Sequence, residues 1–282
     1  MDNHGRISRR TLLLGAAAGV AGGVVVERRI GSEKLLHKVG LASSPDHRAT
    51  QRGPKPVTQS FVSEAMGGAV RFATSAPMNP LGVIMCLHGR NSNYRTAFDA
   101  VHLHDVVAEV GTPLVVVGVD GGASSYWHRR KSGVDPQAML HDELWPRLDE
   151  QFGPSLPRVI MGWSMGGYGA LLAAERHPDM YRAVVAASPA LFRSFADSAD
   201  GAFDDAADFR RHDVFAGVDS LSDTVVRIDC GTGDPFVGAA RSLAELLPKA
   251  NPGRFSRGFH DAAYWRSVAP AQVRTIAAAL GV

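Results

Sequence analysis

A serine in a glycine-rich turn is the residue of this chain whose type and spacing most directly suggest chemistry. Gly162-Trp163-Ser164-Met165-Gly166 follows the apolar run 159–161 and leads into an Ala- and Leu-rich segment that reaches about residue 174. A G-x-S-x-G pattern between a strand and a helix is typical of a nucleophile elbow, a sharp turn that exposes the serine hydroxyl. Glycines permit the close backbone approach that such a turn requires. The pattern therefore predicts that Ser164 is a nucleophile; a glycine-rich turn that only packs is the alternative.

A serine hydroxyl becomes a good nucleophile only when a base removes its proton, and an acid must orient that base. Where the serine stands on such an elbow, the acid and then the histidine follow it in the chain. The histidines downstream of Ser164 are His177, His212 and His260. His177 comes at the end of the elbow helix and His212 lies in an aspartate-rich segment, whereas His260 directly follows the predicted strand 254–259. His260 is therefore the expected base.

The acid is expected in the loop after the predicted strand 224–229. Gly231-Thr232-Gly233-Asp234-Pro235 is a glycine-rich turn with Asp234 at its tip, followed by a predicted helix. A helix N-cap without a catalytic part is the alternative for Asp234. Asp229 is the nearest rival, but it lies within the strand pattern, where its side chain would point into a layer of helices. Asp261 follows His260 directly and is placed to cap the last helix.

Two backbone N–H groups are expected to stabilise the negative charge that develops when the serine attacks. One belongs to Met165, directly after the serine, and the other to Arg90, which follows His88-Gly89 at the end of the predicted strand 82–87. Each donor of such an oxyanion hole contributes about 10²–10³ in rate. The prediction concerns the Arg90 backbone, since its guanidinium could be either a solvated surface charge or a substrate clamp.

Two aromatic residues, Tyr126 and Trp127, are weaker candidates for contacts with the substrate. They follow Asp120-Gly121-Gly122 in a loop at the catalytic end of the predicted sheet. They could form one wall of a substrate site, or they could only pack the loop. The sequence leaves both interpretations open.

Metal and disulfide chemistry is not expected. His102 and His104 are two residues apart on a predicted helix and so point to different faces, which argues against a shared metal ion. Two cysteines, Cys86 and Cys230, are too few for a disulfide framework. Both come at the ends of apolar strand-like runs, so they are expected to be buried free thiols.

The alternation of strands and helices predicts the fold class. Apolar runs at 82–87, 113–119 and 182–187 are typical of strands buried on both faces. Helical patterns at 94–110, 135–152, 236–247 and 262–280 separate the predicted strands. Such alternation predicts an α/β fold with a mostly parallel central sheet and helices on both faces. The aspartate-rich segment 190–222 breaks the rhythm and is expected to form a cap insertion over the catalytic end.

The N-terminus is expected to be an export signal and not part of the fold. Ser8-Arg9-Arg10 and the uncharged 16-residue run 11–26 resemble a twin-arginine signal. A short membrane anchor is the alternative, although the run is shorter than the about 20 residues that span a bilayer comfortably. We therefore expect an extracytoplasmic protein that is secreted or anchored at the membrane or cell envelope. Residues 27–60, rich in charge, Pro, Ser and Gly, are expected to be a linker, and 61–282 the catalytic domain.

Composition and charge fit a compact enzyme of this kind. The 282 residues include 45% hydrophobic ones, enough to bury a substantial core. The net charge of +2 is unevenly distributed, because residues 1–26 carry +2 and residues 27–60 carry +4. The remaining body therefore carries −4 and gives no reason to expect a nucleic-acid partner.

Taken together, the motifs resemble the putative-esterase branch of the α/β-hydrolases, which holds S-formylglutathione hydrolase (esterase D), feruloyl esterases and the mycolyltransferases. The resemblance covers the chain from about residue 60 to its end. It implies an α/β-hydrolase fold, a triad of Ser164, Asp234 and His260, and an oxyanion hole formed by the amides of Arg90 and Met165. The motifs that carry it are LHGRN (87–91), DGGASSYW (120–127), GWSMGGYGA (162–170), GTGDPF (231–236) and FHDAAYW (259–265).

The expected function is that of a serine esterase, which hydrolyses a carboxylic ester through an acyl-enzyme on Ser164 and needs no cofactor. An acyltransferase that passes the acyl group to a sugar or lipid hydroxyl of the cell envelope is one alternative. A non-catalytic binding protein with the same fold is another, and the intact Ser/Asp/His set argues against it. The expected partner is a small-molecule, lipid or sugar ester, and the N-terminal segment could also associate with a membrane.

Overall fold

The computed structural model describes residues 36–249 and 252–282. The predicted export signal, 1–26, and the first part of the predicted linker lie outside these residues. The chain forms two compact units, 1–42 and 43–282. Of the first unit, only residues 36–42 are described, and they contain a short helical turn at 36–38. All the elements named below belong to the second unit.

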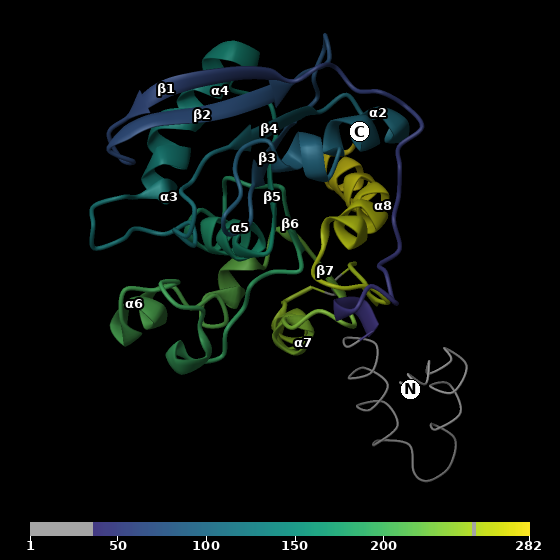
Figure 1. The fold of residues 1–282 in the computed structure, drawn as a ribbon. Coiled ribbons are helices and arrows are strands. Elements are labelled where there is room, and N and C mark those ends of the chain that lie inside the picture. The colour runs from purple at the N-terminus through teal and green to yellow at the C-terminus, as the bar shows by residue number, and fades with distance from the viewer. Residues whose placement is uncertain (1–35, 250–251) are drawn as a thin grey trace, which may run out of the picture. The chain divides into compact units, whose positions relative to one another are not determined.

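Eight strands form one sheet in the order β1-β2-β4-β3-β5-β6-β7-β8 (Figure 1). Strand β2 pairs antiparallel with β1 and with β4, and all the other neighbours are parallel. Strand β5, which leads to Ser164, pairs with β3 along one edge and with β6 along the other, and its residues 159–163 are buried. The strands are β1 (Val57–Ser63), β2 (Gly68–Ser75), β3 (Val83–Leu87), β4 (Val115–Val119), β5 (Arg158–Trp163), β6 (Ala183–Ala187), β7 (Val225–Gly231) and β8 (Phe255–Ser256).

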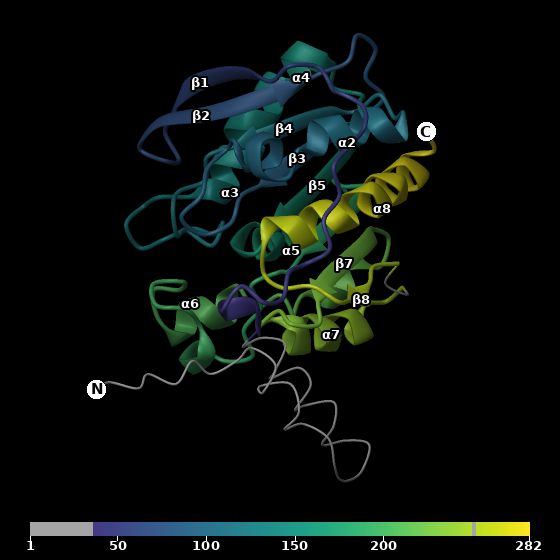
Figure 2. The same ribbon diagram turned by 45° about the vertical axis from the view of Figure 1, so that its right-hand side comes forward.

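Helices cover both faces of this sheet, as predicted. Neighbouring residues of a strand point to opposite faces, so Ile160 packs with the helices of one face while Val159 and Met161 pack with those of the other. Figure 2 brings the second face forward, where α8 and α2 lie side by side. The first face is covered by α4 (Trp145–Phe152), α5 (Met165–Arg176) and α7 (Val237–Leu246), and the second by α2 (Leu103–Val110) and α8 (Ala262–Leu280).

Most predicted elements are confirmed, with three differences in the helices and strands. The predicted helix 135–152 is found as three consecutive pieces, α3 (Pro136–Ala138), η3 (Met139–Leu144) and α4, and Asp135 caps it by accepting from the Ala138 N–H. The predicted helix 94–110 is interrupted between η2 (Thr96–Ala100) and α2, because His102 adopts a left-handed conformation with φ 55°. The predicted strand 254–259 is reduced to the two residues of β8, which leaves 257–261 as a loop.

The first strand, β1, was not expected from the sequence and lies largely in the predicted linker. Its seven residues pair in register with β2, from Val57 opposite Thr74 to Ser63 opposite Gly68. As the edge strand it leaves Val57 and Val62 exposed. Along β1, apolar side chains are therefore not the ones that are buried. The sequence of β1 lacks the alternation of apolar and polar residues that marks a half-buried strand.

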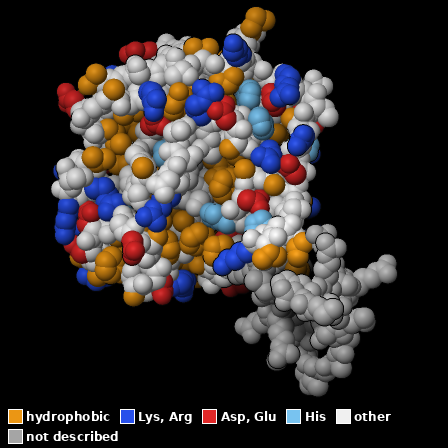
Figure 3. Space-filling model, viewed as in Figure 1, with side chains coloured by type: hydrophobic (Ala, Val, Ile, Leu, Met, Phe, Trp, Pro, Cys, Tyr) orange, Lys and Arg blue, Asp and Glu red, His pale blue; other side chains and the backbone are white. Residues whose placement is uncertain are grey.

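The described surface mixes side chains of different kinds. Figure 3 shows acidic and basic side chains interspersed over one face, with hydrophobic side chains gathered in patches between them. Among the residues described, no helix is long and apolar enough to cross a membrane. This finding does not test the predicted membrane anchor, because residues 1–26 lie outside the described part of the chain.

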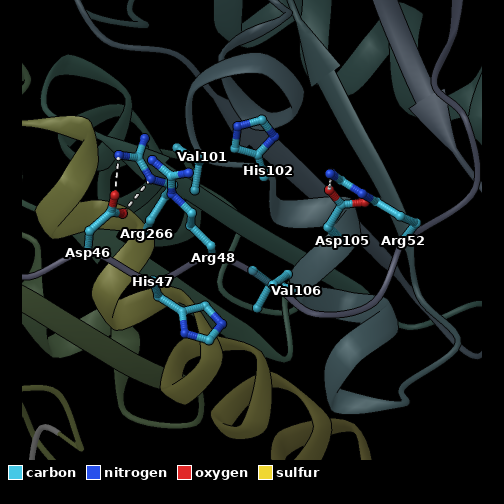
Figure 4. A pocket seen from close by; sticks show the side chains of 10 residues that line it. Asp46, His47, Arg48, Arg52, Val101, His102, Asp105, Val106 and Arg266 are labelled. Atoms are coloured by element: carbon cyan, nitrogen blue, oxygen red, sulfur yellow. Dashed lines mark hydrogen bonds and ion pairs between the residues drawn. The ribbon is translucent and has the colours of Figure 1, made fainter.

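Residues 43–56 also belong to the compact unit and are not a free linker. Asp46 forms an ion pair with Arg266 of α8 (2.6 Å), and Arg52 forms one with Asp105 of α2 (2.7 Å). The second oxygen of Asp105 accepts the Gly53 N–H at 2.9 Å. Figure 4 shows both ion pairs at the rim of a cavity of about 390 Å³ between this segment and the two helices. The expected linker therefore ends earlier than residue 60.

The predicted cap insertion, 190–222, connects β6 to β7. It contains η4 (Phe195–Asp197), α6 (Ala206–Arg211) and η5 (Val218–Leu221). Its contacts reach two other parts of the molecule: Arg130, in the loop after β4, pairs with Asp204 at 2.8 Å, and the Tyr168 hydroxyl of α5 donates to the His212 carbonyl at 2.6 Å. The cap is therefore attached to the elbow helix and to the loop after β4.

A buried ion pair ties the last helix to the sheet. Both oxygens of Asp229, a residue of β7 without exposed surface, accept from the Arg227 guanidinium at 2.8 and 2.9 Å. The same carboxylate accepts from the side-chain amide of Gln272 on α8 (2.9 Å) and from the Arg254 N–H (2.9 Å). As predicted, the Asp229 side chain points into a layer of helices. Because it anchors α8 and the chain ahead of β8, it stabilises the segments on either side of His260.

We expect Asp229→Asn to lower the free energy of unfolding by about 3–5 kcal/mol, because the variant leaves the Arg227 charge buried without a counter-charge. The measurement is urea unfolding of the full-length chain. Asp223→Asn is the matched control, since Asp223 is exposed and should change stability by less than about 0.5 kcal/mol. Equal stability of the two variants would contradict an anchoring role for Asp229.

A second expectation concerns Glu175, on the face of α5 that contacts the cap. Burial, together with the nearby Asp213 charge, raises the pKa of its carboxyl from an ordinary 4.5 to about 9. The folded chain therefore holds this proton more tightly than the unfolded chain. The resulting stabilisation is complete below the pKa that the Glu175 carboxyl has in the unfolded chain. It is lost as the pH rises through the pKa that this carboxyl has in the folded chain. Glu175→Gln cannot ionise, so its free energy of unfolding should fall less between about pH 5 and pH 9 than that of the wild type. Parallel pH profiles of the two proteins would contradict this.

Candidate active site

The serine of the elbow occupies the turn between β5 and α5. Ser164 has φ 57° and ψ −119°, a conformation that side chains rarely adopt. The turn is tight because glycines flank it. A Cβ at Gly162 would collide with the carbonyl group of Gly166, and a Cβ at Gly166 would collide with the carbonyl group of Leu87. The backbone contact between the elbow and the end of β3 therefore requires both glycines, as the motif predicts.

The structure brings the three predicted triad residues together. His260 Nε2 lies 2.9 Å from Ser164 Oγ, although 96 residues separate them in the chain. His260 Nδ1 lies 2.8 Å from Asp234 Oδ2. Because the carboxylate can only accept, Nδ1 carries the ring proton and Nε2 presents a lone pair to the serine hydroxyl. This is the tautomer that a general base needs.

Asp234 is held by its own turn. Its side chain has no exposed surface, and its second oxygen, Oδ1, accepts the Phe236 N–H at 2.9 Å. The turn directly follows β7 and precedes α7, as the Gly-rich pattern predicts. Burial and this hydrogen bond fix the carboxylate, so it can fix the ring of His260 in turn.

His260 lies in the loop between β8 and α8, and contacts on both sides hold that loop. Asp261 caps α8 by accepting the Tyr264 N–H at 2.8 Å, as predicted. The Ser44 hydroxyl donates to Asp261 Oδ2 (2.8 Å) and accepts the Phe259 N–H (2.9 Å). A residue ahead of β1 thus positions the histidine loop, a contribution that the sequence did not suggest.

The loop that carries Arg90 packs against the elbow. A Cβ at Gly89 would lie 3.5 Å from the Ser164 Cβ, so the backbone just before Arg90 runs beside the nucleophile. Met165 begins α5 directly after the serine. Both backbone groups predicted for the oxyanion hole therefore come from segments that border Ser164. The Arg90 guanidinium binds the Ser124 hydroxyl and the Asp200 carbonyl of the cap, so it bridges two surface segments.

The side chain of His88 stabilises the loop that carries Arg90 through two hydrogen-bond contacts. Its Nδ1 lies 2.8 Å from the Gly89 carbonyl and its Nε2 accepts the Gly121 N–H at 3.1 Å. Burial lowers the pKa of His88, which favours the neutral ring that these two bonds require. His88 thus links the loop after β3 to the loop after β4. No sequence pattern singled His88 out, although it stands next to Gly89 in the LHGRN motif.

The predicted substrate contacts, Tyr126 and Trp127, are placed differently from the expectation of a pocket wall. Trp127 has no exposed surface, and its indole N–H donates to the His88 carbonyl at 3.1 Å. A Cβ at Gly169 would collide with it, so the ring fills the space over the first turns of α5. Tyr126 is 3% exposed and packs among other aromatic rings of α5 and the cap. Trp127 therefore packs the loop, which was the alternative interpretation.

Other aromatic side chains surround the histidine instead. The ring of Phe236 lies 5.4 Å from that of His260, and Phe192 of the cap lies 5.6 Å from Phe236. The ring of Trp265, on α8, lies 5.6 Å from that of His260. Phe192 and Phe236 are partly exposed. The signal for Phe236 was its place in the GTGDPF motif directly after the acid, whereas the position of Phe192 depends on how the cap folds.

The remaining candidates are structural. Cys86 and Cys230 are free and buried, as predicted. His177 follows the last residue of α5 and stacks on His141 at 3.8 Å. His102 precedes α2, and His104 packs edge-on against Phe98. Neither His102 nor His104 belongs to a group of potential metal ligands found among the described residues.

Solved structures similar to this chain support the fold. A ferulic acid esterase is 19% identical, with a TM-score of 0.71 over 80% of this chain and 98% of that chain. S-formylglutathione hydrolase from Agrobacterium tumefaciens is 20% identical, with a TM-score of 0.71 over 84% of this chain and 100% of that chain. The fluorophosphonate-binding serine hydrolase F of Staphylococcus aureus is 20% identical, with a TM-score of 0.67 over 81% and 99%. The α/β-hydrolase fold predicted from the sequence is confirmed by these similarities.

The sequence itself gives the more specific result. The profile of the family described as "Putative esterase" matches residues 63–275, which is most of the chain and includes Ser164, Asp234 and His260. The protein therefore belongs to the Putative esterase family and is a carboxylic ester hydrolase.

Proposed function

We propose that the protein is a serine esterase in which Ser164 is the nucleophile, His260 the general base and Asp234 the residue that orients the base. The observation that carries this proposal is the continuous hydrogen-bonded connection from Asp234 Oδ2 through His260 to Ser164 Oγ, with distances of 2.8 and 2.9 Å. The buried acid, the imidazole and the hydroxyl stand in the order that nucleophilic catalysis needs.

The reaction proceeds in two steps. Ser164 Oγ attacks the ester carbonyl carbon while His260 Nε2 takes the hydroxyl proton. The tetrahedral intermediate expels the alcohol, which receives that proton from His260, and the acyl group remains on Ser164. Water then gives a proton to His260 and attacks the acyl carbon; when the intermediate collapses, the acid leaves and Ser164 recovers its proton. A sugar or lipid hydroxyl in place of water would give the acyltransferase alternative by the same second step.

The negative charge of each tetrahedral intermediate needs donors that are already in place. We assign this part to the backbone N–H groups of Met165 and Arg90, because the segments that carry them border Ser164. The N-terminus of α5 adds its positive dipole end on the same side. The strained conformation of Ser164 keeps the hydroxyl directed at this position without reorganisation during the reaction.

The surroundings of His260 favour an ester with an apolar part. Phe236, which is partly exposed, lies next to the base, and the partly exposed Phe192 packs against Phe236. Apolar groups of an acyl chain or an alcohol would bury surface against these rings. The ester of a small molecule, a lipid or a sugar satisfies this condition if one side of the ester bond is apolar.

We also propose that the protein acts outside the cytoplasm after export by a twin-arginine-type signal. The support is the pair Arg9-Arg10 followed by the uncharged run 11–26. Association with the membrane or cell envelope through this segment remains part of the same proposal.

We expect Ser164→Ala to lower turnover of a p-nitrophenyl ester by about 10⁴–10⁶ while the protein stays folded. Labelling by a fluorophosphonate should disappear in the same variant, because the probe reacts with an activated serine hydroxyl. Ser267→Ala is the control: its hydroxyl donates to the Tyr264 carbonyl on α8, away from the triad, so labelling should persist. A Ser164→Ala variant that retains more than about a tenth of wild-type turnover would refute the assignment.

The two aspartates near the end of β7 should respond differently to the same substitution. We expect Asp234→Asn to lower kcat by about 10⁴, since the amide would favour the wrong tautomer of His260. Asp229→Asn should lower stability, while the kcat of its folded fraction remains within about tenfold of the wild type. Rates are compared per mole of folded enzyme. If Asp229→Asn were the more damaging to kcat, the acid would have to be Asp229.

A further inference from the structure

Three buried side chains between the cap and the loop after β4 take no part in the proposed esterase chemistry. His128 lies in that loop, and Asp208 and His212 lie on α6 and directly after it. Their exposed fractions are 0%, 2% and 6%. One nitrogen or oxygen atom from each can be chosen so that all three atoms lie within 4.8 Å of one another. The i, i+4 spacing of Asp208 and His212 puts both on one side of α6.

The hydrogen bonding of His128 is not balanced. Its Nδ1 lies 3.0 Å from the Arg129 carbonyl oxygen, and its Nε2 lies 3.0 Å from the Ala202 carbonyl oxygen. A neutral imidazole has only one N–H to donate. If Nε2 donates to Ala202, the lone pair of Nδ1 faces an oxygen atom. A cation next to Nδ1 would remove this repulsion.

Other potential ligand atoms lie close to His128. His212 Nδ1 lies 2.8 Å from the Asp208 carbonyl oxygen and 3.1 Å from Asp208 Oδ1. Asp208 Oδ2 lies 3.8 Å from His128 Nδ1, and the two imidazole rings stack at 4.2 Å. Arg211 reaches Asp208 Oδ1 at 3.1 Å from a largely exposed position, so its guanidinium can move away without leaving a buried charge.

We propose that His128, Asp208 and His212 form a binding site for a divalent transition-metal ion, of which Zn²⁺ is the type that this ligand set suits best. Two imidazoles and one carboxylate are ordinary zinc ligands, and a water molecule would complete the coordination. A cavity of about 360 Å³ lined by Asp208 and His212, and also by basic side chains such as Arg130 and Arg211, offers room for that water. The bond from His128 Nε2 to the Ala202 carbonyl would orient the ring as second-sphere acceptors of metal-bound histidines do.

The ion would act on structure and not on the reacting atoms. It would join α6 of the cap to the loop that carries Tyr126 and Trp127, and Trp127 in turn holds the His88 carbonyl. The proposal is independent of the proposed catalytic roles, because none of its three ligands belongs to the triad. Loss of esterase activity in a Ser164 variant would leave the metal site unaffected.

The test uses the full-length chain after treatment with a chelator and dialysis. Titration of the wild type with Zn²⁺ alone, followed by calorimetry, should show one saturable site. This site should be weakened or lost in variants of the cluster. Thermal unfolding should shift to a higher temperature in the presence of Zn²⁺, because the ion binds the folded chain. His212→Gln and Asp208→Asn should each weaken binding by at least about tenfold.

His177→Gln is the matched control, since His177 also stacks on a second histidine, His141, but lies outside the cluster. It should bind Zn²⁺ as the wild type does. Because a variant of the cap could fold poorly, Co²⁺ is added to the wild type as well, where nitrogen and oxygen ligands of low symmetry should give a visible absorption band. No saturable Zn²⁺ site in the wild type, or binding that is unchanged in both cluster variants, would overturn the proposal.

Discussion

The site depends on one close contact between backbones, where the turn from β5 into α5 meets the end of β3. Gly166 lies against the Leu87 and His88 carbonyl groups, and Gly162 lies against Gly166 itself, so neither position has room for a side chain. This contact holds Ser164 in its unusual conformation and brings residues 88–90 beside it. A looser turn would move the nucleophile and the predicted oxyanion donors apart at the same time, because they are fixed to each other by backbone and not by flexible side chains.

The other two triad residues reach this point from the far part of the chain, and different interactions hold each of them. Asp234 is fixed by burial within a turn that directly follows β7. His260 lies in a longer loop, which is held by Ser44 on one side and by the start of α8 on the other. Asp229, paired with Arg227 on β7, also accepts a hydrogen bond from Gln272 of α8. It therefore holds the loops that carry Asp234 and His260 in place relative to each other. The buried Asp229–Arg227 ion pair within the sheet thus supports the triad, whose residues lie in the loops that follow the strands.

Sequence patterns predicted the triad because each residue follows a strand in a motif whose glycines or helix caps have a local physical reason. They failed where tertiary packing decides. Trp127 looked available to a substrate, but the space beside Gly121 and Gly169, which are distant in the chain, accommodates its ring. Strand β1 and residues 43–56 showed no apolar period, since an exposed edge and ion pairs with Arg266 and Asp105 hold them. The cluster of His128, Asp208 and His212 joins segments 80 residues apart through a cap whose position no local pattern specifies.

Asp229 and Asp234 show most clearly how position decides what one residue type can do. Both carboxylates are completely buried, near the end of the same strand. Asp229 faces a guanidinium that is itself buried, so its charge is neutralised in place and serves stability. Asp234 accepts the Phe236 N–H and directs its other oxygen at an imidazole, so its charge remains available to the group that must gain and lose a proton. A fixed cation beside Asp234 would compete for the carboxylate and weaken its hold on His260. The absence of an arginine from the glycine-rich turn 231–235 is therefore as much a requirement of the site as the presence of the aspartate.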